Sequence, residues 1–214
     1  MTRMTVIGGT GYAGRHIVEA GVSRGLRVTS ISRSVAADPV PGASYAQGSL
    51  TSAADRARII ADSDVIIVAA SPRGDMAGEL RTSVAQLAQE AAAAGVRLGV
   101  VGGAGSLQVT AGGPRLVDTP EFPEAFRGEG LEMAGILEDL RGTDSELDWF
   151  FVSPAAGFGA HNPGEARGTY RVGTDVILSD EAGVSAIGGA DFAAAVVDEV
   201  TSPAHRRTRF TVAY

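Results

Sequence analysis

The sequence lacks several residue types and patterns, and each absence narrows what the protein does. It contains no cysteine, which excludes disulfides and thiolate metal sites, and we expect no metal site of another kind. It contains no lysine either, since all 18 basic residues are arginine. The formal net charge of −7 gives no electrostatic basis for binding nucleic acid or an anionic membrane.

Long apolar runs are also missing. The longest, VIIVAA at 65–70, is far too short to span a bilayer. The amino-terminal stretch MTRMTVIGG lacks an apolar segment of the signal type. From these two observations we expect a cytoplasmic protein.

The order of apolar and polar segments predicts the fold. Short apolar runs alternate with longer amphipathic stretches, which is typical of parallel β/α units. We expect strands near 4–8, 27–31, 44–47, 64–69, 97–102, 147–152, 176–178 and 208–213, and helices near 12–24, 52–61, 77–95, 124–141 and 190–200. The predicted fold class is α/β: a doubly wound, mainly parallel sheet with helices on both faces and a small C-terminal substrate lobe. We expect one domain over residues 1–214.

Two irregular stretches stand out, at about 103–128 and at 154–175. Each follows the carboxyl end of a predicted strand, which is the edge where open α/β sheets bind ligands. We expect both to be substrate-side loops. Asp191 is expected to cap the last helix, and Gly95 to end the helix at 77–95.

The stretch TVIGGTGYAGRHIV, 5–18, carries the strongest motif. Gly8, Gly11 and Gly14 lie at intervals of three between a predicted strand and a predicted helix. In such a turn the first glycine permits the tight bend, the second admits a phosphate, and the third lets helix pack on strand. The spacing predicts a dinucleotide site with the pyrophosphate at the helix N-terminus.

The end of the second strand bears on the choice of dinucleotide. The strand runs into Ser32 and Arg33, and no acidic residue occurs before Asp38. A guanidinium beside hydroxyls suits a 2′-phosphate, which favours NADP(H) over NAD(H). The alternative is that Arg33 is an ordinary solvated side chain.

Several longer segments resemble one family. GGTGYAGR at the first turn is similar to atypical short-chain dehydrogenases. VVGGAGSL at 100–107, LVDTPEFP at 116–123, LDWFFVSPAA at 147–156 and GTYRVGTDVIL at 168–178 resemble the NAD(P)H-binding family of NADH-flavin reductase-like proteins. That family is similar to biliverdin reductase B and to NmrA-like proteins, and the likeness covers nearly the whole chain.

The resemblance implies a Rossmann fold and a set of cofactor contacts. Gly8 and Gly14 shape the turn, and the implied contacts are Thr10, Gly11, Tyr12, Ala13, Ser32, Arg33, Gly48, Ser49, Leu50, Ala69, Ala70, Ser71, Gly102 and Gly103. Gly48 to Leu50 would lie beside adenine, and Gly102 and Gly103 near nicotinamide. Many relatives have an aspartate where this chain has Ser49.

One departure limits the chemistry. Short-chain dehydrogenases that reduce ketones use a Tyr-x-x-x-Lys pair. This chain has no lysine, and its equivalent helix, AFRGEGLEMAGILEDL, has no tyrosine. Carbonyl reduction by that mechanism is therefore excluded.

Hydride transfer to a flavin needs no strong enzymatic acid, because the flavin ring spreads the charge. We therefore expect an NADPH-dependent oxidoreductase that uses a flavin or another planar acceptor as substrate. The candidate helping residues are Ser106, Tyr170 and His161; Phe122, Phe126, Phe158 and Tyr170 offer flat apolar surface.

Two other functions stay open: a non-catalytic NADP(H)-binding redox sensor of NmrA type, and an isomerase or epimerase, against which the missing Tyr–Lys pair counts. The expected partner is a small planar acceptor, and either a monomer or a homodimer is compatible with the resemblance.

Overall fold

The computed structural model describes residues 1–34, 36–144 and 146–214. Within them, eight strands form one sheet in the order β3-β2-β1-β4-β5-β6-β8-β7. The strands are β1 (Arg3–Ile7), β2 (Arg27–Ser32), β3 (Ser44–Gln47), β4 (Val65–Val68), β5 (Arg97–Val101), β6 (Trp149–Pro154), β7 (Arg171–Gly173) and β8 (Thr208–Ala213). Only β7 pairs antiparallel, with β8. The predicted mainly parallel, Rossmann-type α/β sheet is confirmed.

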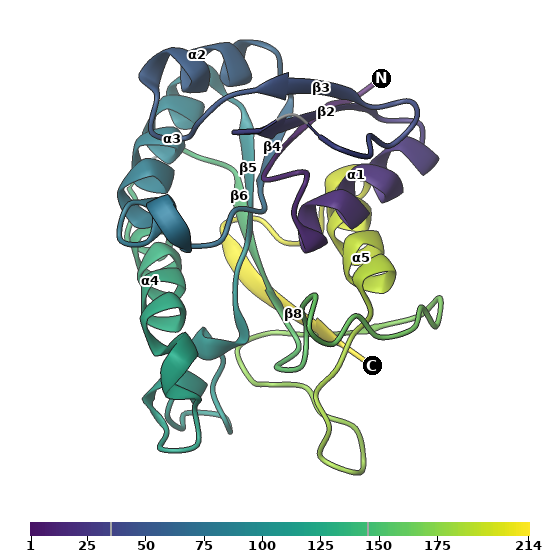
Figure 1. Ribbon diagram of the computed structural model, residues 1–214. Coiled ribbons are helices and arrows are strands. Elements are labelled where there is room, and N and C mark those ends of the chain that lie inside the picture. The colour runs from purple at the N-terminus through teal and green to yellow at the C-terminus, as the bar shows by residue number, and fades with distance from the viewer. Residues whose placement is uncertain (35, 145) are drawn as a thin grey trace.

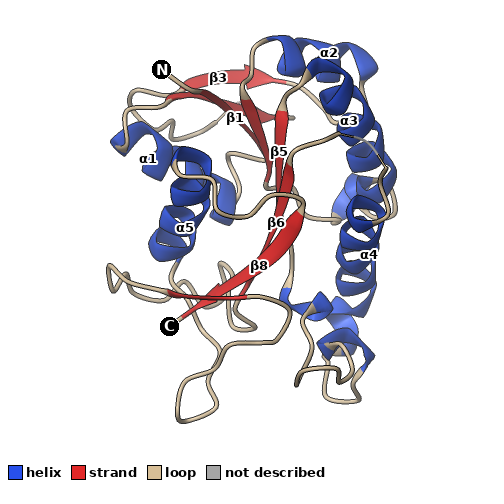
Figure 2. Ribbon diagram, turned by 180° about the vertical axis from the view of Figure 1, so that it is seen from behind, coloured by secondary structure: helices blue, strands red, loops and turns tan. Residues whose placement is uncertain are grey.

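Helices cover both faces of the sheet. On one face lie α1 (Tyr12–Ser23) and α5 (Gly189–Thr201), and on the other lie α2 (Ala53–Ala61), α3 (Leu80–Ala94) and α4 (Glu124–Arg141) (Figures 1 and 2). All five expected helices are present. The third begins at Leu80 rather than at residue 77, and it ends at Gly95 as predicted, with a left-handed φ of 67°.

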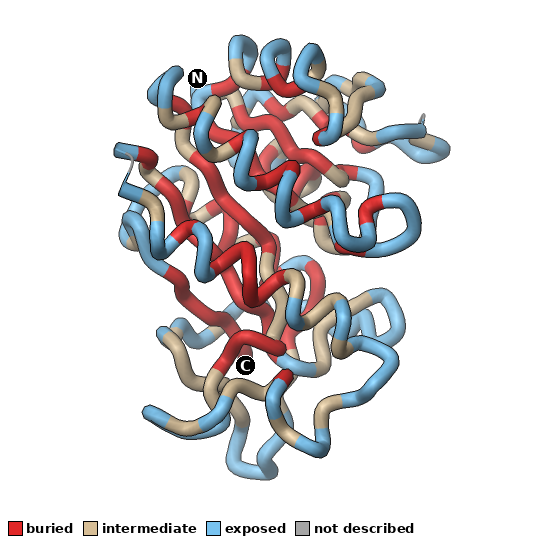
Figure 3. Tube along the Cα trace, turned by 90° about the vertical axis from the view of Figure 1, so that its left-hand side faces the viewer, coloured by how far each residue is buried: buried red, intermediate tan, exposed pale blue. Residues whose placement is uncertain are grey.

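The core follows from strands that are apolar on both sides. Every residue of β4 and β6 is buried, as expected for strands enclosed by two helix layers (Figure 3). Phe150 packs toward α1 and α5, whereas Trp149 and Phe151 pack toward α3 and α4. The period-two alternation of side chains along β6 thus fills both layers.

Two local expectations were wrong. The strand expected at 176–178 is absent: Val176 forms only an isolated bridge with Gln108, and the edge strand is β7. The position of β7 at the sheet edge is set by its pairing with β8, which is distant in the sequence. Arg171 and Val172 are exposed, so β7 lacks the run of buried apolar residues by which a strand can be predicted.

Asp191 does not cap α5, because the cap position is Gly188. Asp191 lies inside the first turn and accepts hydrogen bonds from the amides of Arg167 and Gly168, at 2.6 and 3.0 Å. It also accepts one from the Tyr214 hydroxyl at 2.6 Å. Its role is to fasten the 154–175 segment to the helix.

Both long loops lie in the lower half of Figure 1, the 103–123 loop below α4 and the 154–175 segment on the side of α5. The 103–123 loop contains two single 3₁₀ turns, η2 (Ala104–Ser106) and η3 (Leu116–Asp118). Within the described residues, no helix has both the length and the apolar character needed to cross a membrane.

Candidate functional site

The turn between β1 and α1 needs glycine for steric reasons. Gly8 has a left-handed φ of 82°, and a Cβ there would lie 2.8 Å from the Ala69 carbonyl oxygen. A Cβ on Gly14 would lie 2.1 Å from the Gly8 carbonyl oxygen, which is too close for any other residue. At Gly11 a Cβ would meet only that same oxygen, at 3.3 Å. The turn therefore bends at Gly8, packs at Gly14 and stays open at Gly11.

The N-terminus of α1 is suited to an anion. Gly11 is the cap residue, no side chain caps the helix, and its first turn contains no acidic residue. The first amides of a helix have no partner within it, and the helix dipole places partial positive charge there. These features fit a pyrophosphate, as the motif predicts.

A groove of about 520 Å³ opens beside this turn, at the carboxyl ends of β1, β2 and β4. Eleven of the residues predicted for the cofactor line it: Gly8, Thr10, Gly11, Ser32, Arg33, Gly48, Ser49, Leu50, Ala69, Ala70 and Ser71. The remaining five, Tyr12, Ala13, Gly14, Gly102 and Gly103, do not line it.

Those five have other surroundings. Ala13 packs partly buried against the core between the sheet and α1. A Cβ on Gly102 would lie 2.0 Å from the Phe151 ring, so this glycine makes room for packing. Gly103 precedes η2 as its cap residue.

The end of the groove at residues 48–50 is held by α2. The Gly48 amide donates to the Ser32 carbonyl and the Ser49 amide to Asp55 Oδ2, both at 3.0 Å. The buried Arg56 donates to the Leu50 carbonyl at 2.7 Å. The pKa of Asp55 is lowered, first by the Ser49 amide and then by Arg58. These contacts preform this end of the groove.

Both arginines in the groove are paired with carboxylates. Arg33, after β2, forms an ion pair with Asp75 in η1 (Gly74–Met76). Arg73 pairs with Glu129 of α4 at 2.7 Å. Sequence reasoning missed Arg73 and Asp75, although the segment SPRGDM follows β4 directly, at the ligand-binding edge.

Ser106 lies in a buried polar cluster. Only 6% of it is exposed, and its hydroxyl accepts a hydrogen bond from Arg209 Nη1 at 3.3 Å. Arg209, on β8, also donates to Ser153 Oγ at 3.2 Å and is paired with Asp175. Burial lowers the pKa of Arg209. Ser106 thus contributes to a network that joins β6, β8 and the loop after β5.

Tyr170 lies away from the glycine turn. Its hydroxyl donates to Asp198, and burial, together with this bond, raises the pKa of Tyr170 to about 12. Gly189, at the start of α5, packs against Tyr12 and His16 of α1. Asp198 lies about 13 Å further along α5, so its partner Tyr170 is remote from the glycine turn.

His161 is exposed at the tip of a tight loop closed by a bridge between Gly159 and Asn162. This loop contacts the start of α1. The Tyr12 hydroxyl donates to the Pro163 carbonyl at 2.6 Å, and the rings of Tyr12 and Phe158 lie 5.3 Å apart. Of Ser106, Tyr170 and His161, it is therefore His161 whose loop contacts the N-terminal end of α1.

The aromatic side chains are divided between core and surface. Phe158 is partly buried and packs against the core on Phe192, with ring centroids 4.4 Å apart. Phe126, at the start of α4, is 43% exposed, and the Arg73 guanidinium lies 5.8 Å from its ring centre. Phe126 therefore offers flat surface next to a residue that lines the groove.

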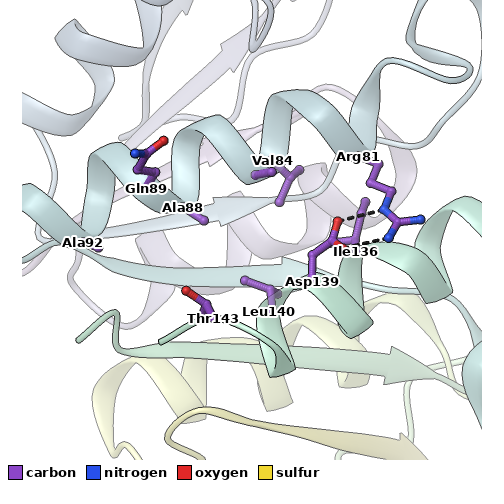
Figure 4. A pocket seen from close by; sticks show the side chains of 10 residues that line it. Arg81, Val84, Ala88, Gln89, Ala92, Ile136, Asp139, Leu140 and Thr143 are labelled. Carbon is purple, nitrogen blue, oxygen red and sulfur yellow. Dashed lines mark hydrogen bonds and ion pairs between the residues drawn. The ribbon is translucent and has the colours of Figure 1, made fainter. Parts of the chain in front are cut away.

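A second hollow, of about 280 Å³, lies between α3 and α4 (Figure 4). Apolar side chains such as Ala88, Ala92 and Leu140 line most of it, and the Arg81–Asp139 ion pair, at 2.7 Å, lies along it. No residue predicted for the cofactor or the substrate lines it.

Comparison with known proteins places these features in a family. The sequence matches the NAD(P)H-binding family over residues 8–203. It is 35% identical to the uncharacterized protein YwnB of Bacillus subtilis (strain 168) over 217 residues, covering 98% of this chain and 97% of that one.

Two solved structures share the whole fold. A Streptococcus pneumoniae TIGR4 protein, provisionally named an NADH-flavin reductase, is 32% identical with a TM-score of 0.88, covering 100% of this chain and 99% of that chain. A Bacteroides thetaiotaomicron protein, provisionally named an epimerase, is 30% identical with a TM-score of 0.87, covering 100% and 97%. The resemblance to atypical short-chain dehydrogenases is thereby confirmed, and the chain belongs to the NAD(P)H-binding family.

Proposed function

We propose that the protein is an NADPH-dependent oxidoreductase that transfers a hydride to a flavin or another planar acceptor without a Tyr–Lys pair. The observation that carries this proposal is the groove beside the uncapped α1 N-terminus, with Arg33 at the end of β2. The family match supports a nicotinamide cofactor and an oxidoreductase. The name of the S. pneumoniae relative supports a flavin as acceptor.

The preference for NADPH rests on the groups at the end of β2. Ser32, Arg33 and Ser34 line the groove there, and none of them is acidic. A guanidinium holds a phosphate through charge-assisted hydrogen bonds, whereas NAD sites carry an acid that accepts from the ribose hydroxyls. We therefore propose that Arg33 binds the 2′-phosphate.

The acceptor must tolerate a site without a strong acid. When bound, NADPH would supply the hydride, and the chain's own residues would orient both rings and exclude water. We propose that the exposed Phe126 ring stacks on a planar acceptor and that the loop with His161, held to α1 through Tyr12, covers it. Gly102 and Gly103 remain our proposal for the nicotinamide end.

The test measures NADPH oxidation with FMN, riboflavin or dichlorophenolindophenol as acceptor. Gly11→Trp should abolish both binding and turnover, because the indole would fill the open side of the turn. Gln86→Trp, at an exposed position on α3, is the matched control and should behave as wild type. Circular dichroism verifies that both variants fold.

Two outcomes would contradict the proposal. Tight NADPH binding without oxidation by any acceptor would favour a redox sensor of NmrA type. A lack of uptake of either pyridine coenzyme would overturn the assignment of the groove itself.

A further inference from the structure

The Arg33–Asp75 ion pair spans the groove between two separate loops. Arg33 follows β2, and Asp75 lies in η1 after β4. Both residues line the groove, and their side chains are 54% and 69% exposed. Among the described residues that line the groove, Asp75 is the sole carboxylate.

This pairing bears on how a phosphate would bind. A guanidinium presents its donors in a planar fork, and carboxylate and phosphate compete for that fork because both accept hydrogen bonds there. A 2′-phosphate that binds Arg33 would therefore displace the Asp75 carboxylate, and the displaced carboxylate would still repel the phosphate electrostatically. A ribose with a free 2′-hydroxyl would meet neither obstacle.

We infer that Asp75 is a specificity-determining residue of the groove: its carboxylate competes with a 2′-phosphate for Arg33 and so narrows the preference for NADP(H) over NAD(H). The inference rests on the proposed function, since it takes the groove to be the adenosine side of a dinucleotide site. The loop after β4, which lies outside the glycine motif, would thus contribute to the choice between the two coenzymes.

The local structure allows Asp75 to yield. It lies between Gly74 and Gly78, whose φ values of 60° and 79° are left-handed, and a Cβ at either glycine would meet no atom within 4 Å. The Gly78 amide is held by Glu132 Oε2 at 2.8 Å, which fixes the far end of the segment. Because the Asp75 side chain is itself 69% exposed, it can turn from Arg33 into solvent with little loss of packing.

The other arginine in the groove has a different arrangement. Arg73 is held by Glu129, which belongs to α4 and does not line the groove. Asp38, near Arg33 in sequence, is paired with Arg15 at 2.9 Å. Competition for Arg33 is therefore specific to Asp75 among these acids, and Asp38 provides a matched control.

Calorimetric titration with adenosine 2′,5′-bisphosphate and with AMP tests the inference, because these probes differ at the 2′ position. Asp75→Asn should tighten the bisphosphate about five- to tenfold and change AMP less than about twofold. In an Arg33→Ala background only the screened repulsion between Asp75 and the phosphate remains to be relieved, so the same substitution should tighten the bisphosphate less than about twofold. Asp38→Asn should leave both affinities as in wild type.

Three results would overturn the inference. Weaker AMP binding by Asp75→Asn would mean that the carboxylate holds the ribose. An equal gain for the bisphosphate without Arg33 would mean general repulsion rather than competition. If wild type binds neither these probes nor either coenzyme, the proposed function fails and this inference fails with it. The second result leaves the proposed function intact, whereas the first leaves a dinucleotide-dependent oxidoreductase but counts against its preference for NADPH.

Discussion

Arg33→Ala is the sharpest single test of coenzyme choice. A charge-assisted hydrogen bond contributes about 1.5–3 kcal/mol. Two features of the structure reduce this value. The Arg33 side chain is 54% exposed, and its ion pair with Asp75 must break before it binds a phosphate; an exposed ion pair of this kind contributes about 0–1 kcal/mol. We therefore expect NADPH binding to weaken by about 1–2 kcal/mol, or roughly 5- to 30-fold. NADH binding should change less than about twofold.

The assay is a fluorescence titration of each reduced coenzyme into wild type and variant, at two salt concentrations. The difference between variants should shrink at high salt, because exposed charges are screened. Arg15→Ala is the matched control, since Arg15, on α1, is paired with Glu19 of the same helix and with Asp38 of the loop after β2. An equal loss of affinity for NADPH and NADH would refute the assignment of Arg33 to a phosphate.

Three further predictions concern the scaffold of the site. Gly14→Ala should lower the free energy of unfolding by about 1–3 kcal/mol in urea denaturation, because its methyl group would clash with the Gly8 carbonyl; unchanged stability would contradict this contact. Tyr12→Phe should speed amide exchange at 158–165 while changing NADPH affinity less than about threefold, because it removes the hydroxyl that bonds the Pro163 carbonyl and the Gly189 backbone; unchanged exchange would show that the bond to Pro163 does not hold the loop. Glu199→Gln should cost about 2–3 kcal/mol at pH 7. Burial alone would raise the pKa of Glu199, but hydrogen bonds from Arg97, His205 and the backbone hold it below its ordinary value. A carboxyl group with a lowered pKa stabilises the fold at pH values above its unfolded-state pKa, and this stabilisation is lost as the pH falls through its folded-state pKa. The difference in unfolding free energy between wild type and Glu199→Gln should therefore disappear in acid. A difference that stays constant with pH would contradict the assignment.

The glycine turn and the groove could be predicted because their signals are local. Gly8, Gly11 and Gly14 act within one turn, and strands such as β4 are apolar throughout, so their burial could be predicted from composition. The ends of parallel strands then bring Ser32, Gly48 and Ala69 to one edge without further information.

The rest depended on partners that lie far apart in the sequence. Ser106 meets Arg209 across 103 residues, and no local pattern marks that contact. Tyr170 finds Asp198 on another element, and Asp191 holds a loop instead of its own helix end. The pairing of Arg33 with Asp75 was likewise invisible, because exposed charges form ion pairs according to tertiary geometry.

The contact between α1 and α5 has a consequence for how the protein holds together. Gly189 leaves the space that His16 and Tyr12 occupy, so α1, the helix that we propose binds the nucleotide, packs directly on α5. Removing α5 and β8 would expose the apolar side chains of Ile17 and Val18 to water and leave α1, with its proposed phosphate site, without the layer on which it packs. For this reason we propose that residues 1–214 fold as one domain, whose dinucleotide half cannot be excised as a working fragment.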